Sequence, residues 1–302
     1  MLVRYLILLF WVLIAGQAQA DPAVTLLVPD QKPASQEFSQ AFRMALKQIA
    51  PEIEVQDVSA LGERASPKDK IVVAVGSQAF AAGLKDQQGR TLVATLLPRL
   101  AYEKILAQQT PKGLVSAVYL DQPEDRQLNL LSLLPGQMNK VGVLHSANTG
   151  ISLTRLRASA QKVKMSLVAE ALSSPRDLAL SLQTLLEKVE VLLATPDPDV
   201  FNPQSIQSIL LTSYRSRIPM VGFSAAYTRA GALVSLHSSV SQLAEQTAEM
   251  VRTLSTGGAV PPPQAPRKFE VSINRQVARS LGINLSTESA LAEQLALRER
   301  MP

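Results

Sequence analysis

Residues 71–79 read IVVAVGSQA, and residues 191–199 read VLLATPDPD. In both stretches a continuous apolar run ends in polar residues that include glycine or proline. Uninterrupted apolar runs of this length are typical of strands that are covered on both faces, as in parallel sheets. The two stretches therefore predict buried parallel strands that end in polar loops.

Further strands and amphipathic helical stretches alternate along the chain on both sides of these runs. The predicted strands are residues 24–28, 53–58, 71–75, 91–97, 115–120, 141–144, 166–169, 191–194, 220–223 and 269–273. The predicted helices are residues 38–49, 152–163, 177–189, 205–217 and 240–254. Strands that alternate with helices indicate βαβ units. The predicted fold class is therefore α/β with parallel sheets.

The alternation runs through two series, which predicts two lobes. We expect the first lobe to contain residues 21–119 and residues 233–285, and the second to contain residues 120–232. The proline-rich residues 260–266 predict a stiff connector. The remaining residues, 286–302, predict a loose C-terminal helix.

The first twenty residues have the three parts of a secretory signal peptide. Arg4 supplies a positive charge, residues 5–16 are apolar without interruption, and Ala18 and Ala20 are the small residues that a signal peptidase reads. A membrane anchor is the alternative, but spanning a bilayer takes about 20 apolar residues. We therefore expect cleavage after Ala20 and a soluble periplasmic protein that starts at Asp21.

The composition leaves little chemistry for catalysis. The chain has no cysteine, which excludes thiol catalysis and cysteine-based metal sites. His145 and His237 are its only histidines, and the sequence contains neither an HExxH nor a GxSxG motif. The formal net charge of +5 is spread along the chain, without a basic run interleaved with aromatic residues. We therefore expect no enzyme activity, no catalytic residues, no cofactor, no metal and no nucleic-acid partner.

Polar loops, residues 76–78, 146–149 and 195–199, follow three of the predicted strands. Open α/β sheets bind ligands at the carboxyl ends of their strands. The free N–H groups at the start of a helix suit an anion, and Asp197 can accept a hydrogen bond from a ligand amine. Helix capping, for example by Ser77, is the alternative for each loop taken singly. Three such loops at corresponding strand ends favour a ligand-binding cleft.

From about Lys112 to Leu285 the chain resembles the ABC-transporter substrate-binding proteins related to the tryptophan/tyrosine-type solute receptors. The stretches that carry the resemblance are VLLATPDPD (191–199), SIQSIL (205–210), RIPMVGFS (217–224), YTRAGAL (227–233) and KFEVSINRQVARSLG (268–282). The resemblance implies a type I periplasmic-binding fold, in which two Rossmann-like lobes are joined by three crossovers and hold a ligand between them.

Carried over residue by residue, the resemblance also implies a set of ligand contacts. They are Ser77, Gln78, Ser146, Asn148, Thr149, Asp197, Ser224 and Tyr227. Two segments, residues 29–34 and residues 145–150, depart from the family pattern. Tyr102, Tyr119 and Tyr227 lie near predicted strand ends and are the candidates for stacking on a ligand.

The resemblance leaves two candidate functions. The first is the periplasmic solute-binding component of an ABC uptake system, which closes its lobes on a small molecule such as an amino acid and is recognised by an inner-membrane permease. The alternative is an envelope protein-interaction module that keeps the fold without solute transport. The two differ in one structural feature: a solute receptor keeps polar anchors on both lobes, whereas an interaction module fills the cleft with apolar side chains.

Overall fold

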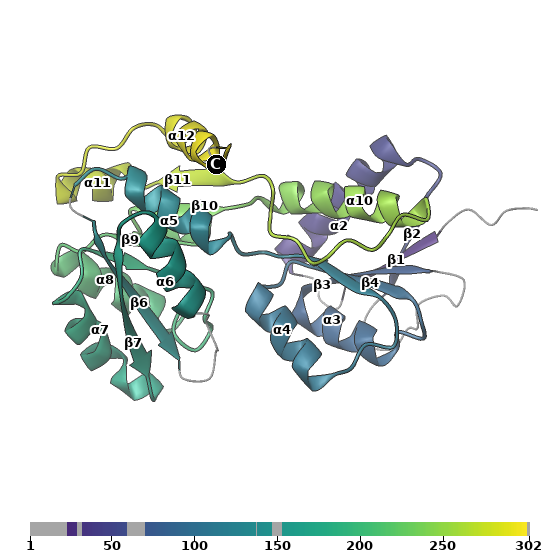
Figure 1. The fold of residues 1–302 in the computed structure, drawn as a ribbon, viewed down its shortest axis with the longest axis horizontal. Coiled ribbons are helices and arrows are strands. Elements are labelled where there is room, and N and C mark those ends of the chain that lie inside the picture. The colour runs from purple at the N-terminus through teal and green to yellow at the C-terminus, as the bar shows by residue number, and fades with distance from the viewer. Residues whose placement is uncertain (1–22, 29–31, 59–69, 137, 147–152, 301–302) are drawn as a thin grey trace, which may run out of the picture.

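The structure is a computed structural model that describes residues 23–28, 32–58, 70–136, 138–146 and 153–300. The predicted signal peptide, residues 1–20, lies outside the described residues. Within the described ranges, no helix is both long and apolar enough to cross a membrane. Figure 1 shows two α/β lobes side by side, joined by extended segments.

The first lobe is built on a five-stranded parallel sheet of order β2-β1-β3-β4-β5. Its elements are β1 (Ala23–Leu27), α2 (Pro33–Ile49), β2 (Glu54–Val58), β3 (Ile71–Val75), α3 (Gly76–Lys85), β4 (Thr91–Thr95), α4 (Arg99–Gln108) and β5 (Val115–Val118). Alternate residues of a strand point to opposite faces. Ile71, Val73 and Val75 of β3 accordingly pack against α2 and α10 (Val240–Ser255), while Val72 and Ala74 pack against α3 and α4.

The second lobe is built on a six-stranded sheet of order β11-β10-β9-β8-β6-β7, parallel except for the antiparallel pair β10–β11. Its first elements are α5 (Glu124–Leu133), β6 (Lys140–Ser146), α6 (Leu153–Lys162), β7 (Ser166–Leu172), a 3-10 turn (Pro175–Asp177), α7 (Leu178–Leu186), β8 (Val191–Leu193), α8 (Ile206–Arg215), β9 (Met220–Gly222) and α9 (Ala225–Ala230). The lobe is completed by β10 (Val234–His237), β11 (Glu270–Ile273), α11 (Arg275–Leu281) and α12 (Glu288–Arg300). The two largely parallel sheets confirm the predicted α/β fold of two Rossmann-like lobes.

The predicted return of residues 233–285 to the first lobe is wrong for its strands and right for one helix. β10 pairs with β9 and β11 pairs with β10, so both strands extend the second sheet. Their apolar residues belong to the core around β6 and β8, whereas α10 packs against α2 in the first lobe. The physical reason is that β9 leaves an edge open for hydrogen bonding, and the run that follows α9 fills that edge directly.

The prediction of a loose C-terminal helix is also wrong. Leu291 and Leu295 of α12 are buried, one helical turn apart, in the core of the second lobe. The helix lies against α5 and β11 (Figure 1). Burying two leucines on one face fixes a helix that has little amphipathic pattern of its own.

Three passes of the chain connect the lobes: residues 119–123, residues 238–239 and the return from α10 to β11. On the return pass, Gln264 runs parallel to β5: its N–H donates to Ala117 O (2.8 Å), and the Tyr119 N–H donates to Gln264 O (2.9 Å). Ser116 Oγ donates to Pro261 O at 2.7 Å. The proline-rich connector is therefore held along the edge of the first sheet.

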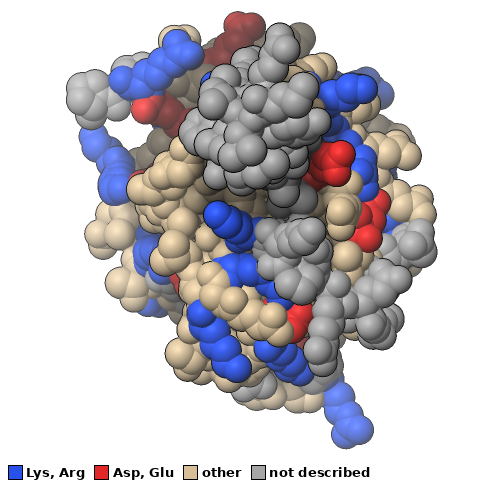
Figure 2. All heavy atoms as spheres, turned by 90° about the vertical axis from the view of Figure 1, so that its right-hand side faces the viewer, with Lys and Arg blue, Asp and Glu red and all other residues tan. Residues whose placement is uncertain are grey.

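The outer end of the first lobe carries charges of both signs. In Figure 2, which looks onto that end, Lys and Arg side chains lie scattered among acidic and uncharged residues rather than in one stripe. This distribution agrees with the modest net charge of +5 of the whole chain.

Candidate functional site

The carboxyl ends of β3 in the first lobe and of β6 and β8 in the second are where a doubly wound sheet binds its ligand, because the strand order reverses there. Ser77 and Gln78 occupy the first turn of α3, directly after β3, and both are exposed. Gly76, the first residue of α3, has a φ of 84°, a left-handed backbone conformation that residues with a side chain disfavour. The cap position of α3 is Val75, so Ser77 does not cap this helix. Ligand contact by Ser77 and Gln78 remains a prediction.

Ser146 and Asp197 are brought together where β6 and β8 end. The Ser146 N–H donates to Asp197 Oδ2 at 2.7 Å, and the Asp199 N–H donates to Asp197 Oδ1 at 3.0 Å. Asp197 has no exposed surface, and Ser146 is 6% exposed. Both carboxylate oxygens therefore accept backbone hydrogen bonds, which gives Asp197 a structural role in joining two loops. Asn148 and Thr149 lie outside the described residues.

Ser224 and Tyr227 follow β9, as expected. Ser224 is half-buried at the cap position of α9, without a side-chain capping bond. The Tyr227 ring packs against Phe223, with centroids 4.5 Å apart, and against Phe201 at 6.5 Å. Burial raises the pKa of Tyr227 to about 12. The ring thus belongs largely to the core of the second lobe, and a ligand contact at either residue remains a prediction.

The predicted stacking role of Tyr102 and Tyr119 is wrong. They are 3% and 8% exposed, and the Tyr102 ring lies between Phe80, at 4.9 Å, and Tyr119, at 5.6 Å. Burial raises the pKa of both phenols to about 12. These aromatic rings fill the core beneath α3 and α4 rather than facing a ligand.

A pocket of about 60 Å³ lies where the two lobes meet at the crossovers. Its lining residues are Arg99 and Leu100 from α4, Asp121 and Gln122 from the first crossover, Glu124 and Gln127 from α5, Arg155 and Leu156 from α6, and Thr195 and Pro196 from the loop after β8. Both lobes contribute, and most of the lining residues are polar or charged, although apolar atoms make up the larger part of the accessible wall. Among the described residues, no group of three histidine, aspartate or glutamate side chains could hold a metal ion.

Charged side chains in this pocket are held in place by hydrogen bonds. The backbone N–H of Arg99 donates to Asp121 Oδ1 at 2.7 Å. Burial raises the pKa of Asp121 to about 6, although the hydrogen bond from Arg99 opposes the shift. Arg99 Nε donates to Glu103 Oε1 at 2.8 Å, and Arg155 Nε donates to Glu124 Oε1 at 2.9 Å. Each lobe therefore presents a positioned guanidinium group at the pocket, with a carboxylate close to each.

Thr195 is the unusual member of this lining. Its side chain is 4% exposed, and within the described part of the chain its Oγ1 has no hydrogen-bond partner. A buried hydroxyl without a partner costs about 1–3 kcal/mol. Because the oxygen itself is buried, a ligand would recover that cost only where closure of the lobes brings a donor or acceptor into contact with it.

The residues of this pocket were not among the predicted ligand contacts. Two of them could have been found from the sequence: Thr195 begins the polar loop 195–199, and Arg99 directly follows a proline at the end of a predicted strand. Asp121 and Arg155 carried no such signal, because a crossover residue and a helix residue become neighbours only when the lobes are assembled.

The comparisons with known proteins agree with this architecture. The family model described as "ABC transporter substrate binding protein" matches residues 66–295. No curated protein matches the sequence significantly.

Three solved structures illustrate the likeness in fold. A domain from Streptococcus pneumonia, solved in complex with L-Trp, is 16% identical, with a TM-score of 0.63 over 90% of this chain and 98% of that one. A conserved domain protein from Vibrio cholerae is 20% identical, with a TM-score of 0.63 over 91% and 98%. A substrate-binding protein with adhesive properties from Clostridium difficile, in its ligand-free open form, is 17% identical, with a TM-score of 0.71 over 88% and 96%.

These folds share the type I periplasmic-binding architecture, and members of the matched family are solute-binding proteins rather than enzymes. Because the family model covers most of the sequence, this chain belongs to the family of ABC transporter substrate-binding proteins.

Proposed function

We propose that this protein is the periplasmic receptor of an ABC uptake system and that it binds a small polar solute, such as an amino acid, between its lobes. Residues 1–20 direct export and are removed after Ala20, and an inner-membrane permease recognises the closed form. The protein itself performs no chemical step. The observation that carries the proposal is the unpaired, buried Thr195 hydroxyl in a pocket to which both lobes contribute.

The pocket fits one polar head group rather than a whole ligand. Its volume of about 60 Å³ is that of roughly two water molecules, well below a typical small-molecule site. Arg99 and Arg155 suit a carboxylate, Asp121 suits an amine, and Thr195 can pair with either. We propose that the rest of the solute extends toward the exposed Ser77 at the start of α3.

Closure follows from this division of contacts. A ligand shifts the protein toward the closed state only by the contacts that it gains there. Arg99 belongs to the first lobe and Thr195 to the second, so a head group that touches both gains most when the lobes are closed. Hinge movement of two domains around a ligand is a common way to couple binding to recognition.

The alternative, an envelope interaction module without solute transport, predicts a cleft filled by apolar side chains. Polar and charged residues from both lobes line this pocket, which supports the receptor, although apolar atoms provide most of its accessible wall. The interaction-module alternative would be supported if no solute raised the thermal stability of the protein.

The test is a thermal-shift screen of residues 21–302 against amino acids, small peptides, sugars and purines, together with a matched pair of variants. Thr195→Val removes the unpaired hydroxyl of the pocket, and Ser213→Ala removes the other buried unpaired hydroxyl, which lies in α8. Without ligand, each change should raise stability by about 1 kcal/mol, since an unsatisfied buried group is lost.

With a ligand at a hundred times its Kd, the natural protein should gain about 2.7 kcal/mol of stability. That ligand-dependent gain should fall strongly in Thr195→Val and stay unchanged in Ser213→Ala. A ligand shift that is equal in the two variants would refute the role of Thr195. A flat screen across all four solute classes would refute the receptor.

A further inference from the structure

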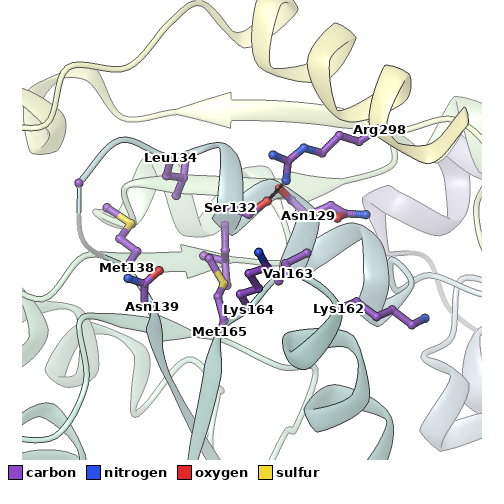
Figure 3. A pocket seen from close by; sticks show the side chains of 12 residues that line it. Asn129, Ser132, Leu134, Met138, Asn139, Lys162, Val163, Lys164, Met165 and Arg298 are labelled. Atoms are coloured by element: carbon purple, nitrogen blue, oxygen red, sulfur yellow. Dashed lines mark hydrogen bonds between the residues drawn. The ribbon is translucent and has the colours of Figure 1, made fainter. Parts of the chain in front are cut away.

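A second cavity, of about 650 Å³, opens in the second lobe at the amino-terminal ends of β6 and β7. It lies at the opposite edge of the sheet from the pocket between the lobes, which faces the carboxyl ends of the strands. Figure 3 shows it between the end of α5, the segment before β6, the α6–β7 turn and α12. Its volume is in the range of small-molecule sites.

One wall of this cavity is apolar. Leu131, Leu134, Met138 and Met165 line it, and all four side chains are buried members of the lobe's core. In Figure 3, Met138 lies in the segment before β6 and Met165 in the segment before β7. Methionine side chains are flexible and polarisable, and they adapt readily to apolar ligands of irregular shape.

The rim of the cavity is basic. Lys162, Lys164 and Arg298 line it together with Asn129, Ser132 and Asn139, and none of the twelve described lining residues is acidic. Lys162 is already paired with Asp125, at 2.8 Å. By contrast, Lys164 and Arg298 form no ion pair with any residue in the described ranges.

Lys164 and Arg298 line the same cavity from different elements. Arg298 donates to Ser132 Oγ and reaches down from α12 to it, and Lys164 stands at the α6–β7 turn below (Figure 3). That turn is fixed by two backbone hydrogen bonds, from Lys164 N–H to Gln161 O at 3.0 Å and from Met165 N–H to Ala160 O at 2.9 Å. The cavity therefore places two cationic side chains, Lys164 and Arg298, beside an apolar wall.

Neighbouring acids do not neutralise this charge. Asp125 pairs with Lys162 and Glu299 pairs with Arg126. The Oε2 atom of Glu190 accepts the backbone N–H groups of Asn139 and Lys140 at 2.7 and 3.1 Å. Its carboxylate is thus engaged at the start of β6. A ligand with an anionic group would form ion pairs with Lys164 and Arg298 and so neutralise the positive charge of the rim.

We propose that this cavity is a second ligand site, for a small carboxylate with an apolar body, such as an aromatic carboxylate. The carboxylate pairs with Lys164 and Arg298, and the apolar body lies against Met138 and Met165. The site is separate from the pocket between the lobes and does not depend on the solute bound there.

Isothermal titration calorimetry on residues 21–302 tests the proposal with phenylacetate, indole-3-acetate, the neutral analogue phenylacetamide and inorganic phosphate as probes. We expect at least one of the two carboxylates to bind with a Kd of about 1 mM or tighter. Phenylacetamide should bind at least about tenfold more weakly, because it lacks the charge. Phosphate should also bind at least about tenfold more weakly, because it lacks the apolar body.

Matched variants locate the binding. Lys164→Gln and Arg298→Gln, both at exposed positions, should each weaken carboxylate binding about tenfold, whereas Lys188→Gln, an exposed lysine at the end of α7, should not. Thr195→Val should leave this binding unchanged, which separates the second site from the proposed solute pocket. Failure of both carboxylates to bind, equal binding of phosphate, or carboxylate binding that is unaffected by both cavity variants would overturn the proposal.

Discussion

Replacing Glu299 by glutamine tests the way α12 secures the crossovers. Arg126 Nε donates to Glu299 Oε1 at 2.5 Å, and Arg126 Nη2 donates to Glu299 Oε2 at 3.0 Å. The same guanidinium donates through Nη1 to Gln122 Oε1 and to Pro266 O, both at 2.7 Å, and lies over the Phe269 ring at 4.5 Å. One arginine thus ties the first crossover, the return crossover and the C-terminal helix together.

The size of the effect follows from burial. The Arg126 side chain is 9% exposed and that of Glu299 is 28% exposed. A hydrogen bond to a charged group contributes about 1.5–3 kcal/mol, and breaking a fully buried pair costs about 3–5 kcal/mol. Glutamine keeps one acceptor, and solvent partly screens the pair. We therefore expect a loss of about 2 kcal/mol, which lowers the Tm by about 4–8 °C in a protein of this size.

Differential scanning calorimetry at pH 7 measures this change, and Glu293→Gln provides the control. Glu293 is exposed on the same helix and forms no ion pair with any described residue. Hydrogen exchange of residues 288–300 should rise in Glu299→Gln only, because α12 loses its anchor. A Tm within about 1 °C of the control variant would show that the Arg126 network does not secure the crossovers.

Three further predictions concern the pocket and the two cores. Asp121 has a folded-state pKa of about 6, above the ordinary aspartate value of 3.8, so the folded protein binds more protons and loses stability as the pH rises between these values. Urea unfolding at pH 4 and at pH 6 should show a loss of about 2 kcal/mol that Asp121→Asn removes, and an equal pH dependence in both proteins would contradict the shift. Gly222→Ala should cost about 1–3 kcal/mol in urea unfolding, because the new Cβ would clash with Tyr227, and an unchanged midpoint would contradict this packing. Leu295→Ala should lower the free energy of unfolding by about 2–5 kcal/mol in the same measurement, since that side chain has no exposed surface. Leu297→Ala, at a 56% exposed position, should lower it far less. Equal losses of stability in the two variants would indicate that α12 is only loosely attached.

Local pattern was enough to predict most of the elements. The continuous apolar run of residues 71–75 became β3 and the run of residues 191–194 became β8, because a strand covered on both faces needs apolar side chains at every position. The spacing of Phe38, Phe42 and Ile49 in the same way predicted α2. These features depend on neighbours in sequence, so they can be read without the fold.

The candidate site was predicted less well, because strand-end position does not say which way a side chain points. Asp197 stands in the predicted loop, yet its carboxylate is turned inward to the N–H groups of Ser146 and Asp199. Thr195, two residues earlier, lines the pocket with its hydroxyl unpaired. A loop of five residues can present either side chain, and only the packing of β6 against β8 selects one.

The sequence by itself determined the α/β class, the two series of strands and helices, and the family resemblance, because apolar periodicity and local motifs are properties of contiguous residues. Only the tertiary structure decided that β10 and β11 complete the second sheet while α10 covers the first, since an open sheet edge and an uncovered sheet face are both filled by distant segments. It also brought Arg99, Arg155 and Thr195 to one pocket. These residues come from three separate segments of two lobes, and no spacing along the chain encodes a distance that is set by how the lobes pack.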